Sequence, residues 1–298
     1  MLLEIMKHEK EDMESLHNRV ENRVSSFFSR VFYKRVFSSL TMIAFMVLLF
    51  FLGNLAVQIF SVFLVLYVSF EWVFVCRLSQ KILGALSIVF CTYMGMLCTQ
   101  FSHGIMGLGV LFLVASITII IGWVTLRRGF LWTAIGMFYI GIPFICLTWI
   151  TLKVPQSIMI LAWMVVFVSL NDVGGYIFGR GIGGPKLYPR VSPNKTWSGY
   201  IGGVLFSTVG SLCFFYISPF GGDFLIYLFM TIFLIHIAIF GDLIESAIKR
   251  YHGIKDSGSL IPGHGGALDR LDGYLTTLPF LTLIIYMQPS FFFALSRT

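Results

Sequence analysis

The sequence predicts an all-α, polytopic membrane protein, and two observations carry that prediction. Hydrophobic residues make up 57% of the 298-residue chain and charged residues only 12%, whereas an ordinary soluble domain is about 25% charged. The apolar residues also gather in runs of about 20, the length that a helix needs to cross a bilayer. Helices are expected because lipid offers no hydrogen-bond partner to an open backbone.

Residues 1–38 precede the first apolar run and form a charged tail that we expect in the cytoplasm. Within 19–35, apolar side chains recur near helical spacing among basic residues. This pattern is typical of an amphipathic helix on an anionic membrane surface. A solvated tail is the alternative.

The remaining chain, residues 39–298, is predicted to be one integral membrane domain with about nine spans. The break between the first two spans rests only on Gly53 and Asn54. The expected spans are residues 39–53, 55–75, 82–101, 105–124, 130–150, 156–173, 200–218, 224–241 and 273–294.

The basic residues support this count. With nine spans, the N-terminal tail and the loops after the even-numbered spans share one side, and that side holds all 21 Lys and Arg residues except Lys153 and Arg297. Cytoplasmic loops carry an excess of Lys and Arg. We therefore expect the N-terminus and the polar loops 174–199 and 242–272 in the cytoplasm, and the C-terminus outside.

The positions of the charged residues and of the cysteines indicate which kinds of ligand the protein is suited to bind. The net charge of +7 is spread along one membrane surface, which favours anionic lipid and phosphorylated ligands over nucleic acid. The five cysteines have neither paired spacing nor the Cys/His clustering typical of zinc sites.

Loop 242–272 holds five of the 14 acids and four of the basic residues. Asp269 and Asp272 would share one face of a helix that continues into the last span, and Asp242 stands at the end of the eighth span. Three such carboxylates could bind Mg²⁺, which takes oxygen ligands and leaves positions for phosphates. Pairing with neighbouring Lys and Arg is the alternative.

A glycine-rich turn precedes the two aspartates. Gly265 and Gly266 would let backbone N–H groups approach an anion, and a turn that leads into a helix adds a favourable dipole. His264 would donate to a phosphate, support a carboxylate, or make a structural hydrogen bond.

Loop 174–199 follows Asp172, an acid at the end of an apolar span. Ionisable residues at membrane depth are expensive and therefore suggest function. The basic side chains of this loop suit phosphate binding, although anchoring at the membrane surface is the alternative. Glu71, another acid near the end of a span, would anchor that span or line a lipid cavity.

Both polar loops contain motifs at fixed spacing: the stretches 246–250, 255–258 and 262–272, an Asp, Gly-Arg pattern at 172–180 and Ser-Pro-Asn-Lys-Thr at 192–196. These motifs resemble the signature of the phosphatidate cytidylyltransferases, also called CDP-diacylglycerol synthases. Two residues depart from it: the family usually has a bulkier apolar residue in place of Ala267, and often a Glu in place of Ser198.

The resemblance implies attack of the phosphatidate phosphate on the α-phosphorus of CTP, with release of diphosphate. It implies Mg²⁺ as cofactor, with a place for a second cation, and the metal ligands Asp242, Asp269 and Asp272. The catalytic residues that we expect are Lys249, His264, Asp269, Arg270 and Asp272. The residues expected to bind substrate or phosphate are Asp172, Arg180, Lys186, Ser192, Lys195, Thr196, Arg250, Lys255, Gly265 and Gly266.

The expected partners are CTP, phosphatidate and membrane lipids, without nucleic acid, and both a monomer and a homodimer stay open. The expected location is the bacterial inner membrane. One alternative function is a CTP-dependent lipid kinase of the polyprenol or phytol type. A transporter is the other, but it would place polar residues midway through its spans.

Overall fold

The computed structural model describes residues 41, 44–101, 104–124, 129–218, 223–258 and 265–288. The charged tail predicted for residues 1–38 lies outside the described residues, and so does His264.

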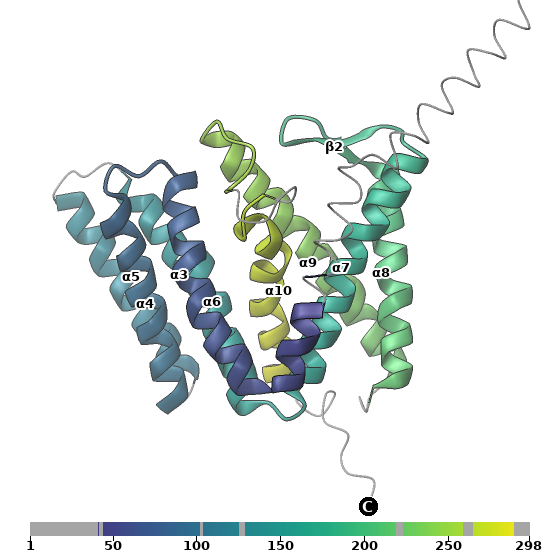
Figure 1. The fold of residues 1–298 in the computed structure, drawn as a ribbon, viewed down its shortest axis with the longest axis horizontal. Coiled ribbons are helices and arrows are strands. Elements are labelled where there is room, and N and C mark those ends of the chain that lie inside the picture. The colour runs from purple at the N-terminus through teal and green to yellow at the C-terminus, as the bar shows by residue number, and fades with distance from the viewer. Residues whose placement is uncertain are drawn as a thin grey trace, which may run out of the picture.

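Helices make up almost all of the described chain (Figure 1). Residues 44–52 are helical and end at Gly53, whose φ of 85° interrupts the helix before α3. The helices that follow are α3 (Asn54–Val75), α4 (Lys81–Phe101), α5 (Gly104–Val124), α6 (Phe130–Lys153), α7 (Ser157–Gly181), α8 (Trp197–Ile217), α9 (Phe224–Tyr251) and α10 (Leu268–Met287).

Seven helices, α3 to α9, are long and apolar enough to cross a membrane. This result confirms the predicted all-α, polytopic membrane protein. α10 corresponds to the ninth predicted span, but it begins with the charged residues Asp269, Arg270 and Asp272. The first predicted span lies only partly within the described residues.

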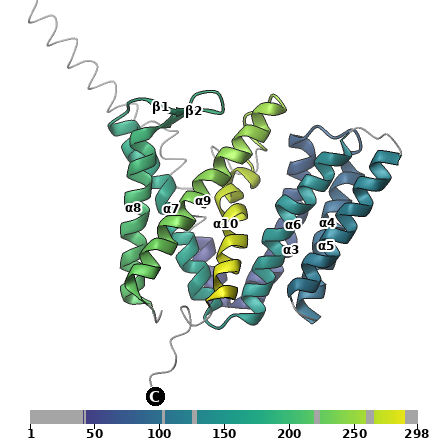
Figure 2. The same cartoon turned by 180° about the vertical axis from the view of Figure 1, so that it is seen from behind.

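Successive helices run in alternating directions, as Figures 1 and 2 show. The last turns of α3, α7 and α9 and the first turn of α10 therefore lie at one end of the molecule. We call this the polar end. It also carries an antiparallel hairpin of β1 (Lys186–Tyr188) and β2 (Ser192–Thr196). The two polar loops are thus neighbours in space.

Helices extend into both polar loops. α7 continues to Gly181 and α8 begins at Trp197, while α9 continues to Tyr251 and α10 begins at Leu268. Small residues explain the first case: a Cβ on Gly179 would lie only 3.3 Å from the Cα of Gly199. Such residues allow two helices to approach closely, so these glycines serve helix packing rather than a loop.

Buried apolar side chains form two clusters that meet at α10. One cluster joins the C-terminal half of α10 to α7 and α9, through residues such as Leu281, Phe167 and Leu234. The other joins the start of α10 to α3, α4, α5 and α6, and includes Leu268 and Leu275. α10 therefore lies at the seam between two packed halves.

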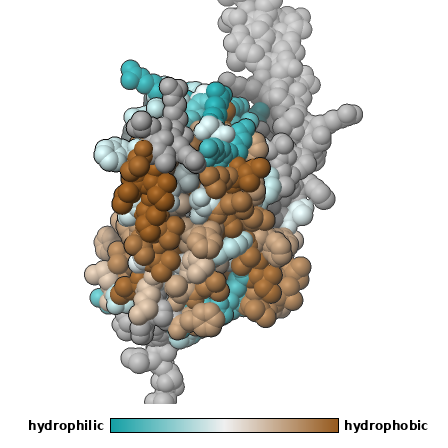
Figure 3. Space-filling model, turned by 90° about the vertical axis from the view of Figure 1, so that its left-hand side faces the viewer, coloured by the Kyte–Doolittle hydropathy of each residue, from teal (hydrophilic) through white to brown (hydrophobic). Residues whose placement is uncertain are grey.

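The outer surface suits a lipid environment. Figure 3 shows a broad apolar face, with hydrophilic residues gathered mainly at the polar end. Large side chains such as Phe51 and Phe101 are more than four-fifths exposed, which a water-soluble monomer rarely tolerates over a continuous surface.

Candidate active site

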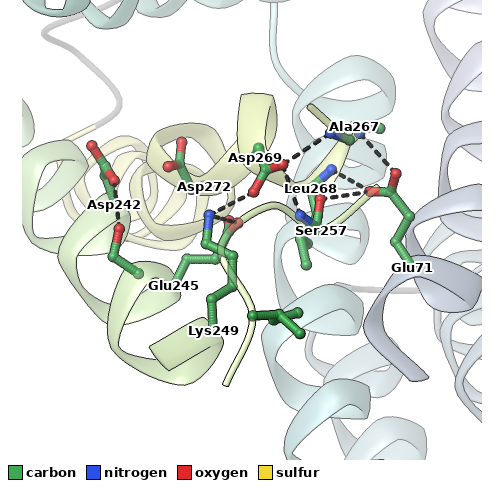
Figure 4. Close-up of polar contacts among 12 residues, drawn as sticks. Glu71, Asp242, Glu245, Lys249, Ser257, Ala267, Leu268, Asp269 and Asp272 are labelled. Atoms are coloured by element: carbon green, nitrogen blue, oxygen red, sulfur yellow. Dashed lines mark hydrogen bonds and ion pairs between the residues drawn. The ribbon is translucent and has the colours of Figure 1, made fainter. Parts of the chain in front are cut away.

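Acidic side chains from α9 and α10 face one another at the polar end (Figure 4). Asp242, Glu245 and Lys249 follow one another at intervals of three and four residues, so they share one face of α9. Asp272 on α10 lies close enough to Asp242 and Glu245 for their charges to interact. The structure therefore brings together the acids of two helices.

Lys249 lies between two of these carboxylates. Its Nζ is 2.5 Å from Oδ1 of Asp269 and 3.0 Å from Oε1 of Glu245. Lys249 is only 8% exposed and Glu245 only 1%. A buried charge is costly unless it is paired, so this ion-pair triad fixes α9 against the start of α10.

Asp269 also organises the loop that precedes α10. Its Oδ2 accepts hydrogen bonds of 2.9 Å from the backbone N–H groups of Ser257 and Gly266. The N–H of Gly266, expected to face a phosphate, therefore donates to Asp269. Gly265 has a φ of 85°, and a Cβ there would lie 2.4 Å from the same carboxylate oxygen. Glycine is needed at this position for both reasons.

Asp242 connects α9 to the other polar loop. Its carboxylate forms an ion pair with Lys195 of β2 and accepts a hydrogen bond of 3.3 Å from Ser246. Both members of the ion pair are about 30% exposed at their side chains, so water can reach them. Asp272, in contrast, pairs with no Lys or Arg among the described residues, and it accepts the N–H of Gly273 at 2.7 Å.

Asp172 adds a further acid from α7. It is exposed and lies within electrostatic range of Asp242, Lys195 and Arg270. This acid from the loop signature thus belongs to the same charged region.

The donor chemistry of this region fits a divalent metal, although the geometry is not that of a preassembled site. Asp172, Asp242 and Asp272 concentrate negative charge and offer the oxygen ligands that Mg²⁺ prefers. Among the residues that the structure describes, however, no three His, Cys, Asp or Glu side chains are arranged to hold a metal ion. Asp269 already binds Lys249 and two amides, so Asp242 and Asp272 have more oxygen lone pairs free.

Besides Lys195 and Gly266, three more of the expected phosphate-binding residues make contacts within the protein. Thr196 is buried and caps α8, accepting the N–H of Gly199 at 3.2 Å. Arg250 donates to the carbonyl of Val191 at 3.2 Å and to that of Ile254 at 3.3 Å. It thereby ties the hairpin to the end of α9. Arg180 donates to the hydroxyl of Tyr176 at 2.7 Å.

The other expected phosphate-binding residues lie around these contacts. Lys186 is exposed in β1, Ser192 opens β2, and Lys255 is exposed in the loop after α9. Arg270, which was expected to be catalytic, is partly buried in the first turn of α10. Both polar loops therefore bring basic groups to the acids, Lys195 to Asp242 and Lys249 to Asp269.

Glu71 is the residue whose place sequence reasoning missed. It lies on α3, is 5% exposed, and contacts the loop that leads into α10 (Figure 4). The only signal in the sequence was an acid within an apolar run, which suggested importance but no partner.

Comparison with known proteins identifies the family to which this chain belongs. A model of the cytidylyltransferase family matches residues 33–288, which is most of the chain. The chain belongs to the cytidylyltransferase family.

Two relatives support the family resemblance seen in the two loops. This chain is 32% identical over 240 residues to the phosphatidate cytidylyltransferase of Brucella suis biovar 1, and the match covers 80% of this chain and 87% of the relative. It is 40% identical over 147 residues to that of Staphylococcus haemolyticus, covering 49% of this chain and 55% of the relative. The predicted family is therefore confirmed.

Proposed function

We propose that this protein is a phosphatidate cytidylyltransferase, which converts CTP and phosphatidate to CDP-diacylglycerol and diphosphate. The observation that carries the proposal is the meeting of both polar loops at one end of a membrane protein of this family. There, Lys195 of β2 pairs with Asp242 of α9, and Lys249 pairs with Asp269 of α10.

The reaction brings two anionic substrates together, so the site must neutralise the charge of their phosphates. An oxygen of the phosphatidate phosphate attacks the α-phosphorus of CTP, and the bond from that phosphorus to the bridging oxygen of the diphosphate breaks. The lipid phosphate is ionised near neutral pH, so no protein nucleophile is needed. Positioning and charge neutralisation provide most of the catalysis in such chemistry.

The basic residues of the polar end supply part of that neutralisation. Lys195 and Lys255 are accessible to solvent and suit the triphosphate of CTP, while Arg270 lies one residue from Asp269. Lys249 is held deeper and keeps Asp269 in place. Mg²⁺, held mainly by Asp242 and Asp272 with Asp269 beside them, would lower the repulsion between the phosphates.

The proposed setting is the bacterial inner membrane with the polar end toward the cytoplasm. CTP arrives from the cytoplasm, and the basic loop residues gather at this end, as the positive-inside rule expects. This orientation leaves the N-terminus in the cytoplasm and the C-terminus outside.

Transfer of label from CTP to lipid tests the proposal. Purified protein in detergent receives phosphatidate and α-labelled CTP, with Mg²⁺ or with a chelator. We expect labelled lipid only with Mg²⁺, and about 100-fold less for Asp269→Asn or Asp272→Asn, since electrostatic groups of active sites contribute at this scale. No labelled lipid from folded wild-type protein contradicts the proposal, and labelled lipid from γ-labelled CTP would indicate a lipid kinase instead.

Asp223→Asn is the matched control for these variants. Asp223 precedes α9 at the opposite end of that helix from the active site, and its carboxylate accepts the N–H of Leu225 at 2.7 Å. The control removes one carboxylate charge without touching the polar end, so lipid labelling should persist.

A further inference from the structure

The carboxylate of Glu71 binds the backbone at the start of α10. Its Oε1 accepts the N–H of Ala267 at 3.1 Å, and its Oε2 accepts the N–H of Leu268 at 2.7 Å. The hydroxyl of Ser257 also donates to Oε2, at 3.3 Å. A residue of α3 therefore holds a loop that lies almost 200 positions later in the sequence.

This carboxylate and Asp269 hold the same loop from two sides. Ser257 donates its hydroxyl to Glu71 and its backbone N–H to Asp269, while Gly266 donates its N–H to Asp269. The two acids thus bind both described ends of the loop, residues 257–258 and 265–268. The fit is close, because a Cβ on Gly266 would lie 2.2 Å from Ser257 Oγ and 2.4 Å from Glu71 Oε1.

The charge of Glu71 suits this backbone role. The first N–H groups of a helix lack partners within the helix, and negative charge is favourable there. No Lys or Arg forms an ion pair with Glu71 among the described residues, so three hydrogen-bond donors stabilise the buried carboxylate instead. A buried carboxylate is tolerated when it is satisfied in this way.

We infer that Glu71 is a positioning residue of the active site. It fixes the backbone of Ala267 and Leu268, and this backbone sets the place from which Asp269 meets Lys249. The inference rests on the proposed function for its catalytic consequence, although the structural consequence can be measured without activity.

Glu71→Gln is the decisive variant, because it keeps the shape and one carbonyl oxygen but turns the other oxygen into an NH₂ group. That NH₂ group would face a backbone N–H group, and two donors cannot form a hydrogen bond with each other. We expect hydrogen exchange at the amides of Ala267 and Leu268 to become faster. We also expect kcat to fall about 10- to 100-fold, since small displacements of catalytic groups cost this much.

The Michaelis constant separates positioning from a general loss of structure. If Glu71 acts through Asp269, kcat should fall while KM for CTP stays within about threefold, as for groups that act in the transition state. If Glu71→Gln yields too little folded protein, Ser257→Ala removes one donor of the same network. It should accelerate exchange at residues 265–268 and lower kcat to a smaller extent.

Asp223→Asn serves again as the matched control, because Asp223 also accepts helix N–H groups, those of Leu225 at 2.7 Å and Ile226 at 3.3 Å. Both contacts use Oδ1, which asparagine keeps as a carbonyl oxygen, so exchange at these two amides and kcat per folded molecule should both stay near the wild-type values. Unchanged exchange at Ala267 and Leu268 in Glu71→Gln would overturn the inference, and so would a wild-type kcat per folded molecule. If wild-type protein makes no CDP-diacylglycerol, the exchange result still decides the structural role, so the two failures remain distinct.

Discussion

Replacement of Lys249 by Met tests the ion-pair triad of the polar end most directly. The variant keeps the length of the side chain but leaves Glu245 and Asp269 without their shared cation. At an effective dielectric constant of about 20, each contact at 2.5 to 3.0 Å has a gross attraction of about 5 to 7 kcal/mol. The cost of removing Lys249 from water offsets much of that attraction, and breaking such buried pairs typically costs about 3 to 5 kcal/mol.

The free energy of unfolding in mixed detergent and SDS micelles would measure this cost. We expect Lys249→Met to lower it by about 3 to 5 kcal/mol, because buried acids are then left unpaired. Arg250→Met is the control on the next residue: Arg250 is exposed and makes hydrogen bonds only to carbonyls in the described contacts, so we expect a loss of about 1 kcal/mol. Equal stability of Lys249→Met and wild-type protein would refute the argument that the triad is buried and paired.

Two further pairs of variants test the packing of the polar loops. Gly266→Ala should lower the free energy of unfolding by about 1 to 3 kcal/mol, the usual cost of overpacking, whereas Gly181→Ala should be nearly neutral because no atom lies within 4 Å of a Cβ there; similar losses for both would contradict the crowding. Thr196→Ala should cost about 1 kcal/mol through loss of the α8 cap, and Thr196→Ser should restore most of it; equal melting temperatures for the two variants would argue against the cap.

The sequence was sufficient to predict the architecture, because a chain that crosses lipid must form long apolar helices. Runs of apolar residues predicted the helices, and the basic residues predicted which loops share an end. The positions of Asp242 and Asp272 followed from helical spacing, and the two polar loops do meet. What composition could not reveal was where each helix ends, because α7 and α9 continue beyond their apolar runs, one by glycine packing and the other through a charged face toward α10.

The contacts of individual site residues were beyond sequence reasoning for a different reason. Lys249 was expected to be catalytic, but its pairing with Glu245 and Asp269 could not be foreseen. Glu71 gave no sign of its partners, because they lie on a loop that only the packing of α3 against the start of α10 brings near. Spacing along one helix predicts which residues share a face, and it does not predict which distant backbone groups need an acceptor.

In the proposed function, the place of α10 at the seam of the two halves would set the depth at which the reaction occurs. Asp269 and Asp272 differ in height along this helix by about 4.5 Å, the rise of three residues, and both stand in its first two turns. In the proposed orientation, an acid pair at this level would lie where lipid headgroups meet water. A water-borne nucleotide and a membrane-borne phosphate would then reach the same few atoms while each remains in its own phase.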